Sequence, residues 1–155
     1  MRNDESIVIL LRLLDEAYGK AGWHGPNLRS TIRGLDEAAA TWRPAPERHN
    51  IRELVLHIAY WKYAVRRRLT KLPRGSFPVK GSNWFRRDMA DADAWREEIA
   101  LLQREHQLLR EVVSSLTDRD LARRSGRHDF ARLIYGVASH DLYHTGQIAL
   151  IKRLR

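Results

Sequence analysis

Four long segments of the sequence repeat their apolar residues every three or four positions, which is the spacing of one face of an α-helix. No segment shows the alternation of apolar and polar residues that is typical of a half-buried strand. The pattern predicts an all-α fold with long helices near 4–20, 51–70, 91–116 and 130–153. Between the first two lie a shorter helical piece over 28–35 and an alanine-rich stretch over 36–41.

The stretch over 71–89 has no helical period and contains two prolines and two glycines. It is longer than the turn of a tight helical hairpin. Four long helices with one long connection between the second and the third describe a four-helix bundle with a crossover. We expect residues 1–155 to form one such domain, because this is the length of a single domain and no internal repeat divides it. We also expect Trp61 and Trp95 to be largely buried, since each lies on the apolar stripe of its helix.

The composition excludes several classes of protein. The chain has no cysteine, which removes thiolate catalysis, disulfides and cysteine-based zinc sites. No apolar run approaches the roughly 18 residues of a membrane span. The apolar stretch near the N-terminus is short and is interrupted by Arg12, Asp15 and Glu16, so it does not resemble a signal peptide. We therefore expect a cytoplasmic protein without a membrane partner.

The chain is basic, with 28 lysines and arginines against 19 acidic residues and a net charge of +9. Acidic residues are nevertheless interspersed over much of the sequence, and no helix carries an unbroken basic face. These features disfavour nucleic acid as the main partner. Arginine supplies 23 of the 28 basic residues, and it binds carboxylate and phosphate with two parallel hydrogen bonds. An anionic small molecule is therefore compatible with this charge.

Histidines carry the most information about function. His140 and His144 form an HxxxH pair, and residues four apart lie on one face of a helix. Leu133 and Val137 continue the same stripe, so the pair lies on or beside the inward face. His57 shares the apolar face of the second long helix. A single inward histidine is more often a hydrogen-bonded core residue, but three on two helices of one bundle favour a metal site.

Two stretches resemble the DinB/YfiT-like superfamily of four-helix-bundle metalloproteins. HNIRELVLHIAYW, over 49–61, is similar to that superfamily's second helix, and GVASHDLYHTGQIALIKR, over 136–153, is similar to its last helix. The turns at 23–26 and 42–44 also fit, whereas residues 72–128 match by layout rather than by motif.

The resemblance implies a divalent metal ion held by His57, His140 and His144, with the rest of its coordination open to water or substrate. Zinc or nickel is the ion expected first, with iron, manganese or cobalt as further possibilities, because imidazole suits several of these metals. The superfamily includes S-transferases that use bacterial low-molecular-weight thiols, although residues 72–128 carry no thiol-substrate motif.

Three imidazoles with an open position are the ligand set of a catalytic rather than a structural metal. We therefore expect a metal-dependent enzyme for a small molecule, transferase-like or hydrolase-like, and the resemblance implies thiol S-transfer as its most plausible activity. The alternative is a non-catalytic metal-binding protein of the stress response. A homodimer is expected from the frequency of dimers among soluble proteins. The sequence leaves the native metal and the substrate open.

Four residues next to the histidines have weaker expectations. Gln147 is a weak catalytic candidate, because it could hydrogen-bond to a metal-bound water or substrate, and helix packing is its other possible role. Asp141 and Tyr143 point away from the pair, so we expect them at the surface. Trp61 could wall the pocket or pack in the core.

The remaining histidines are expected to be structural or exposed. His24 lies in a turn and could approach the mouth of the site, and His49 precedes the helix cap Asn50 and is expected to be exposed. His106 falls on an apolar stripe, where it is either a hydrogen-bonded core residue or an alternative ligand. His128 lies in an arginine-rich loop and is expected to be solvated.

Overall fold

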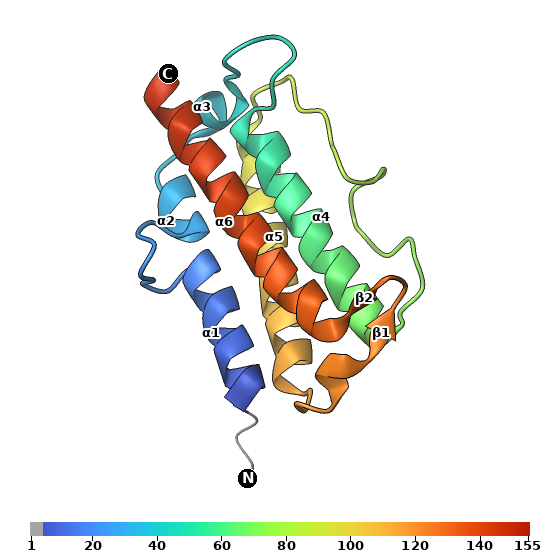
Figure 1. The fold of residues 1–155 in the computed structure, drawn as a ribbon. Helices are drawn as coiled ribbons and strands as arrows, with labels where there is room; N and C mark the ends of the chain where they lie inside the picture. The colour runs from blue at the N-terminus through green and yellow to red at the C-terminus, as the bar shows by residue number, and fades with distance from the viewer. Residues whose placement is uncertain (1–4) are drawn as a thin grey trace.

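The computed structural model describes residues 5–155 and is built mainly of helices (Figure 1). The long helices are α1 (Glu5–Tyr18), α4 (Ile51–Thr70), α5 (Ala92–Ser114) and α6 (Phe130–Leu154). Two short helices, α2 (Leu28–Ile32) and α3 (Glu37–Thr41), lie between α1 and α4. The predicted all-α fold is confirmed, and only the predicted start of the first helix at residue 4 falls outside the described residues.

The arginine-rich loop predicted before α6 contains short regular elements in the structure. A 3₁₀ turn at Asp120–Ala122 precedes a small hairpin of β1 (Arg124–Ser125) and β2 (His128–Asp129). Gly126 has a φ of 65° at the turn of this hairpin, a conformation that glycine adopts at little cost. The two strands are too short to produce a periodic pattern in the sequence.

Side-chain caps explain where the long helices begin. Asn50, predicted as an N-cap, accepts a hydrogen bond from the backbone N–H of Glu53 at 2.9 Å. Asp91 caps α5 and Asp129 caps α6 in the same way. Such caps satisfy backbone donors that the first turn of a helix leaves free.

Helices α4 and α5 run in the same direction. Arg52, near the start of α4, pairs with Glu98 of α5 at 2.7 Å, and Arg66, farther along α4, pairs with Glu105 at 2.9 Å. Residues 71–91, which contain no helix or strand, therefore carry the chain back along the bundle from the end of α4 to the start of α5 (Figure 1).

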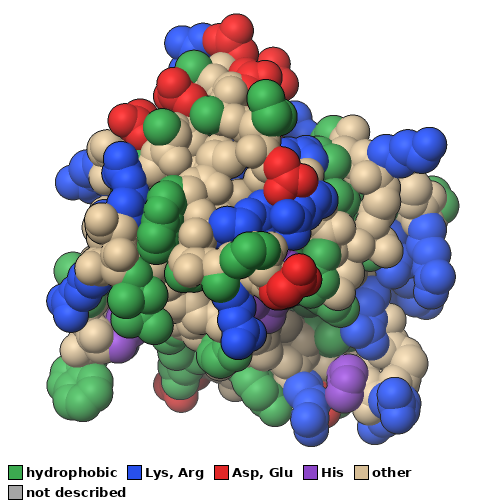
Figure 2. Space-filling model, turned by 90° about the horizontal axis from the view of Figure 1, so that it is seen from above, with side chains coloured by type: hydrophobic (Ala, Val, Ile, Leu, Met, Phe, Trp, Pro, Cys, Tyr) green, Lys and Arg blue, Asp and Glu red, His purple; other side chains and the backbone are tan. Residues whose placement is uncertain are grey.

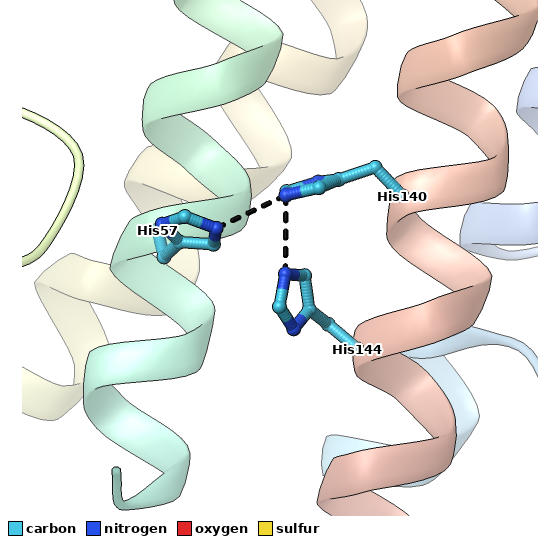
Figure 3. Close-up of side chains that lie close together, drawn as sticks. All are labelled: His57, His140 and His144. Carbon is cyan, nitrogen blue, oxygen red and sulfur yellow. Dashed lines mark hydrogen bonds between the residues drawn. The ribbon is translucent and has the colours of Figure 1, made fainter.

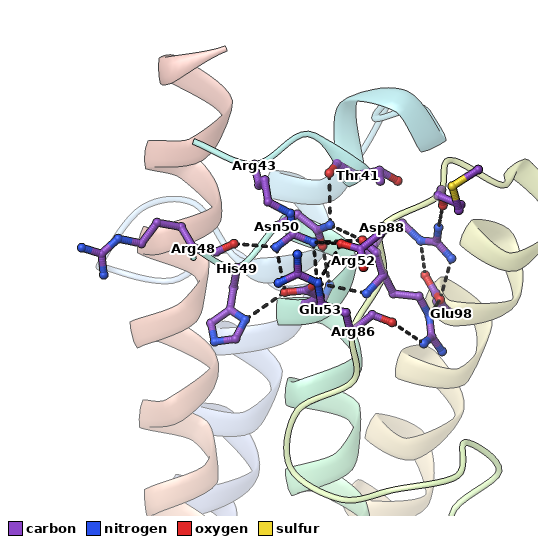
Figure 4. Close-up of polar contacts among 12 residues, drawn as sticks. Thr41, Arg43, Arg48, His49, Asn50, Arg52, Glu53, Arg86, Asp88 and Glu98 are labelled. Carbon is purple, nitrogen blue, oxygen red and sulfur yellow. Dashed lines mark hydrogen bonds and ion pairs between the residues drawn. The ribbon is translucent and has the colours of Figure 1, made fainter. Parts of the chain in front are cut away.

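A network of polar contacts attaches the end of this connection to the start of α4 (Figure 4). Glu53 accepts hydrogen bonds from Arg43 at 2.7 Å and from the backbone N–H of Arg87 at 3.0 Å. Asn50 donates to the carbonyl oxygen of Arg87 at 2.6 Å. Burial raises the pKa of Glu53, but hydrogen bonds from Arg43, Arg87 and His49 outweigh it and lower the pKa to about 2.

The apolar core is divided into two clusters along the bundle. One contains Leu54 and Ile58 of α4, and the other contains Val65 and Leu69 of the same helix. A group of buried polar residues lies between the two clusters along the helices, next to His57: Lys62, His106, Asp141 and His144. Buried polar groups must be paired, so this polar layer requires an explanation.

Only one of the two tryptophan predictions is confirmed. Trp95 is 3% exposed, and its Nε1 donates to the carbonyl oxygen of Leu35 at 2.8 Å. Trp61 is only half-buried, because one side of its ring faces two surface pockets. A stripe position identifies the inward side of a helix but not the pockets between neighbouring elements.

The surface carries charges of both signs. Seen from the end of the bundle, most of the visible acidic side chains gather at one edge, while basic side chains lie around the other sides (Figure 2). None of the helices over residues 5–155 combines the length and the apolar content needed to cross a bilayer.

Candidate metal centre

Three histidines from two helices point toward one another in the middle of the bundle (Figure 3). His57 comes from α4, and His140 and His144 come from successive turns of α6. The Nε2 atom of His140 lies 3.0 Å from Nε2 of His57 and 3.1 Å from Nε2 of His144. Each residue offers one ring nitrogen, and these nitrogens all lie within 4.8 Å of one another.

The ring of His57 is oriented by the connection between α4 and α5. Its Nδ1 donates a hydrogen bond to the carbonyl oxygen of Asn83 at 2.7 Å, and Trp61 Nε1 donates to the side-chain oxygen of Asn83 at 2.9 Å. Asn83 has a φ of 64°, which asparagine tolerates better than most residues. With the hydrogen on Nδ1, the Nε2 of His57 presents its lone pair to the other two histidines.

The other two rings are supported differently. The Nδ1 of His144 donates to the side-chain oxygen of Gln147 at 2.6 Å, so Nε2 of His144 also presents a lone pair. Gln147 thus orients a ring of the triad, and its predicted hydrogen bond to a metal-bound water or substrate stays a prediction. The Nδ1 of His140 is buried and has no hydrogen-bond partner within residues 5–155.

An aromatic stack covers one side of the triad. The indole of Trp84 lies between His57 and His49, with ring centroids 3.8 Å and 3.6 Å apart and the planes nearly parallel. The side chain of His49 is 46% exposed, in line with its prediction, and its Nδ1 donates to Glu53 at 2.9 Å. The sequence alone does not predict that Trp84 lies beside the triad, because residues 71–91 have no helical period from which the position of a side chain follows.

Burial keeps all three rings neutral at pH 7. Loss of hydration lowers the pKa of His57 to about 4 and the pKa of His140 to about 3. The pKa of His144 is also lowered, again mainly by burial. Metal ions bind neutral imidazole, so the environment favours the form of the histidines that binds a metal.

The donor set fits a divalent metal ion. Three nitrogens about 2.0–2.1 Å from a common zinc ion, at tetrahedral angles, lie roughly 3.3 Å apart. Two of the three separations are close to this value, at 3.0 and 3.1 Å, and all three lie within 4.8 Å. Because His57 and His144 carry their hydrogens on Nδ1, neutral rings leave at most one hydrogen for the two close nitrogen contacts. A cation would satisfy all three lone pairs. The triad can therefore hold a metal ion, and three imidazoles do not select among zinc, nickel, cobalt and iron.

The structure corrects the surface position predicted for Asp141. Its side chain is fully buried and forms an ion pair with the fully buried Lys62 of α4. Burial raises the pKa of Asp141, and the nearby Lys62 opposes this rise. The prediction was wrong because position 141 faces the side of α6 that packs on α4, where Lys62 reaches across. The one indication of this ion pair in the sequence is Lys62 itself, a charged residue within the apolar stretch of α4.

The other histidines lie outside the triad. His106 is 6% exposed, accepts a hydrogen bond from Lys62 at 3.3 Å and stacks on Tyr18 at 3.9 Å. The prediction of a hydrogen-bonded core residue is confirmed, and its alternative role as a ligand of the triad is not. His24 is exposed in its turn, and His128 is half-buried rather than fully solvated.

Two pockets reach the triad, and they share no lining residue. A pocket of about 510 Å³ is lined by His140, and one of about 570 Å³ is lined by His144 and Gln147. Trp61 and Val65 line the first, whereas Trp84 lines the second. Neither lining includes an aspartate or a glutamate.

Comparison with known proteins agrees with this geometry. The family model of the DinB superfamily matches residues 22–148, which include all three histidines, the whole of α4 and most of α6. No curated protein and no solved structure gave a significant match. Because the family model covers most of the sequence, the chain belongs to the DinB superfamily.

Proposed function

We propose that this protein is a metal-dependent enzyme that transfers a low-molecular-weight thiol to an electrophilic small molecule. The observation that carries the proposal is the convergence of three neutral imidazole nitrogens at a point reached by two separate pockets. Three protein ligands leave a metal ion with open coordination positions, as in catalytic sites.

Two pockets suit a reaction with two substrates. A transferase must hold a donor and an acceptor at the same time with their reacting atoms in contact. One pocket is lined by His140 and the other by His144, so a molecule in each could present one reacting atom at the triad. A hydrolase, whose second substrate is water, needs only one such pocket.

A divalent ion held by three imidazoles supplies a Lewis acid that lowers the pKa of a neighbouring thiol or water. In the transfer, the thiol loses its S–H proton to solvent, the sulfur forms a bond to an electrophilic carbon, and the leaving group departs with its electron pair. Asn83 and Gln147 keep the rings of His57 and His144 oriented throughout. Trp84 shields one face of His57 from water.

The test is consumption of a thiol in the presence of 1-chloro-2,4-dinitrobenzene, measured with protein loaded separately with zinc, nickel and cobalt. We expect the loaded protein to accelerate the reaction and His144→Ala to remove both the bound metal and the acceleration. His24→Ala is the matched control, because His24 is exposed in a turn, and it should retain both. Acceleration that persists in His144→Ala would contradict the proposal.

A second candidate is a protein that binds the metal without catalysis. It is favoured by one observation, the lack of any aspartate or glutamate in the lining of the two pockets, which leaves no carboxylate to act as a general base there. This candidate predicts stoichiometric metal binding that depends on the triad, together with no acceleration for any thiol and electrophile tested.

A further inference from the structure

The pocket beside His140 combines an apolar wall with cationic side chains. Trp61 and Val65 form part of the wall, and Arg68 and Arg132 also line the pocket. No acidic residue lines it, although the chain contains 19 of them. The charge of these two arginines is therefore not neutralised from within the pocket.

Arg68 differs from two other arginines of its helix in the partner that it contacts. Arg52 and Arg66, also on α4, each pair with a glutamate of α5. Arg68 donates instead to the backbone oxygen and the hydroxyl of Ser125. These contacts hold the half-buried guanidinium in place, use two of its five N–H groups and leave its charge unpaired.

Arg132 has even fewer contacts. Its side chain is exposed on the first turn of α6, and it forms no hydrogen bond or ion pair with other residues of the described chain. The same pocket is therefore lined by Arg68, which Ser125 holds in place, and by Arg132, whose side chain has no such contact. A guanidinium binds carboxylate and phosphate oxygens with short, charge-assisted hydrogen bonds.

The positive charge continues beyond the pocket. A neighbouring groove of about 870 Å³, under the connection between α4 and α5, shares Trp61 and Arg68 with it. Arg67, Arg74 and Lys80 also line this groove, and it too has no acidic residue in its lining. An anion that approaches His140 from this side meets only cationic charge.

We propose that the substrate that reaches the triad beside His140 is an anionic small molecule, whose carboxylate or phosphate is held by Arg68 and Arg132. The inference rests on the proposed function and specifies the substrate class of one of its two pockets. The apolar wall would contact the uncharged part of the molecule, and the two arginines would fix its orientation relative to the triad. A pocket of about 510 Å³ suits a small molecule better than a nucleic-acid backbone.

The experiment compares two thiols that differ in charge. Cobalt-loaded protein is titrated with mercaptosuccinate, which carries two carboxylates, and with 1-thioglycerol, which carries none, and binding is followed by the absorption of the cobalt ion. We expect the wild type to bind mercaptosuccinate at least about tenfold more tightly. Arg132→Gln should reduce this preference about tenfold, and raised ionic strength should also weaken it.

Two further variants keep the test interpretable. Arg68→Gln should also lose the preference, but it removes contacts to Ser125, so Arg132→Gln is the primary variant. Arg12→Gln, on the exposed side of α1, is the matched control and should keep the wild-type preference. The cobalt content of each variant, measured by elemental analysis, reports whether the triad is intact.

The outcomes separate this inference from the function on which it rests. Equal binding of both thiols, or a preference that survives both substitutions, would overturn the anionic substrate and leave thiol binding intact. If neither thiol changes the cobalt spectrum, the thiol function fails, and calorimetry with succinate then decides the anion site. Succinate binding that Arg132→Gln weakens about tenfold would support that site, and no succinate binding would overturn it.

Discussion

At the scale of single residues, the state of the candidate metal centre depends on which nitrogen of each imidazole carries its hydrogen. The backbone of Asn83 and the side chain of Gln147 accept the Nδ1 hydrogens of His57 and His144. Both Nε2 lone pairs are consequently directed at His140. Groups that support metal ligands in this way contribute measurably to metal affinity.

Replacing Gln147 with Ala should weaken metal binding about 10–100-fold without preventing it, because His144 would keep its nitrogen but lose its fixed orientation. Competition with a chromophoric chelator measures this change. Gln103→Ala is the matched control, since Gln103 is exposed on α5. Equal affinities for the two variants would show that Gln147 does not support the ligand.

At the scale of elements, a buried ion pair joins α4 to α6 next to the triad. Lys62 and Asp141 are both fully buried, and Asp141 directly follows His140 in the sequence. Two charges taken out of water cost free energy that their mutual attraction only partly returns. The pair links α4 to α6 beside His140, and removing one partner would leave the other charge buried without compensation.

Lys62→Met should lower the free energy of unfolding by about 3–5 kcal/mol, because it leaves the carboxylate of Asp141 buried without a partner. The double variant Lys62→Met with Asp141→Leu should recover most of this loss. Urea denaturation measures both changes. A double variant no more stable than Lys62→Met would contradict the view that an uncompensated charge causes the loss.

Glu53 makes the attachment of residues 71–91 to the start of α4 dependent on pH. The pKa of Glu53 is lowered from 4.5 to about 2 in the folded protein. A lowered pKa means that Glu53 contributes stability above about pH 4.5 and that this contribution is lost as the pH falls toward 2. Glu53→Gln should therefore be less stable than the wild type at pH 7 by about 1–3 kcal/mol, and this difference should shrink below pH 4. A constant difference from pH 7 to pH 3 would contradict this origin.

At the scale of the whole molecule, the polar layer lies within a bundle whose two apolar clusters do not include it. One cluster contains Ile58 and Leu102, and the other contains Leu109 and Ile134. Each cluster joins residues of α4, α5 and α6. The helices therefore remain packed above and below the layer whether or not a metal ion is bound.

Adding zinc, nickel or cobalt should raise the Tm, because an ion that binds only the folded state stabilises it by mass action. Removing the ion with a chelator should lower the Tm but leave the helical circular dichroism unchanged at 25 °C. His144→Ala should show neither shift. Loss of helix on chelation would mean that the ion, rather than the two apolar clusters, holds the bundle together.

The sequence by itself determined the helices and the three histidines, because both depend on local spacing. The period of apolar residues places α4 and α6 nearly to the residue, and a separation of four puts His140 and His144 on one face. The resemblance to a known family then paired them with His57. The helices and the shared face of His140 and His144 follow from helix geometry and need no knowledge of the neighbouring helices.

Only the tertiary structure decided what lies around the triad. The burial of Asp141 depends on Lys62, a residue of another helix, and the shielding of His57 depends on Asn83 and Trp84, which belong to a connection without any period. Periodicity describes one helix at a time, so it does not determine which side of α6 packs on α4 or where an irregular segment crosses the bundle. Those contacts are set by the packing of the whole chain, because a buried polar group is stable only where the fold brings a partner to it.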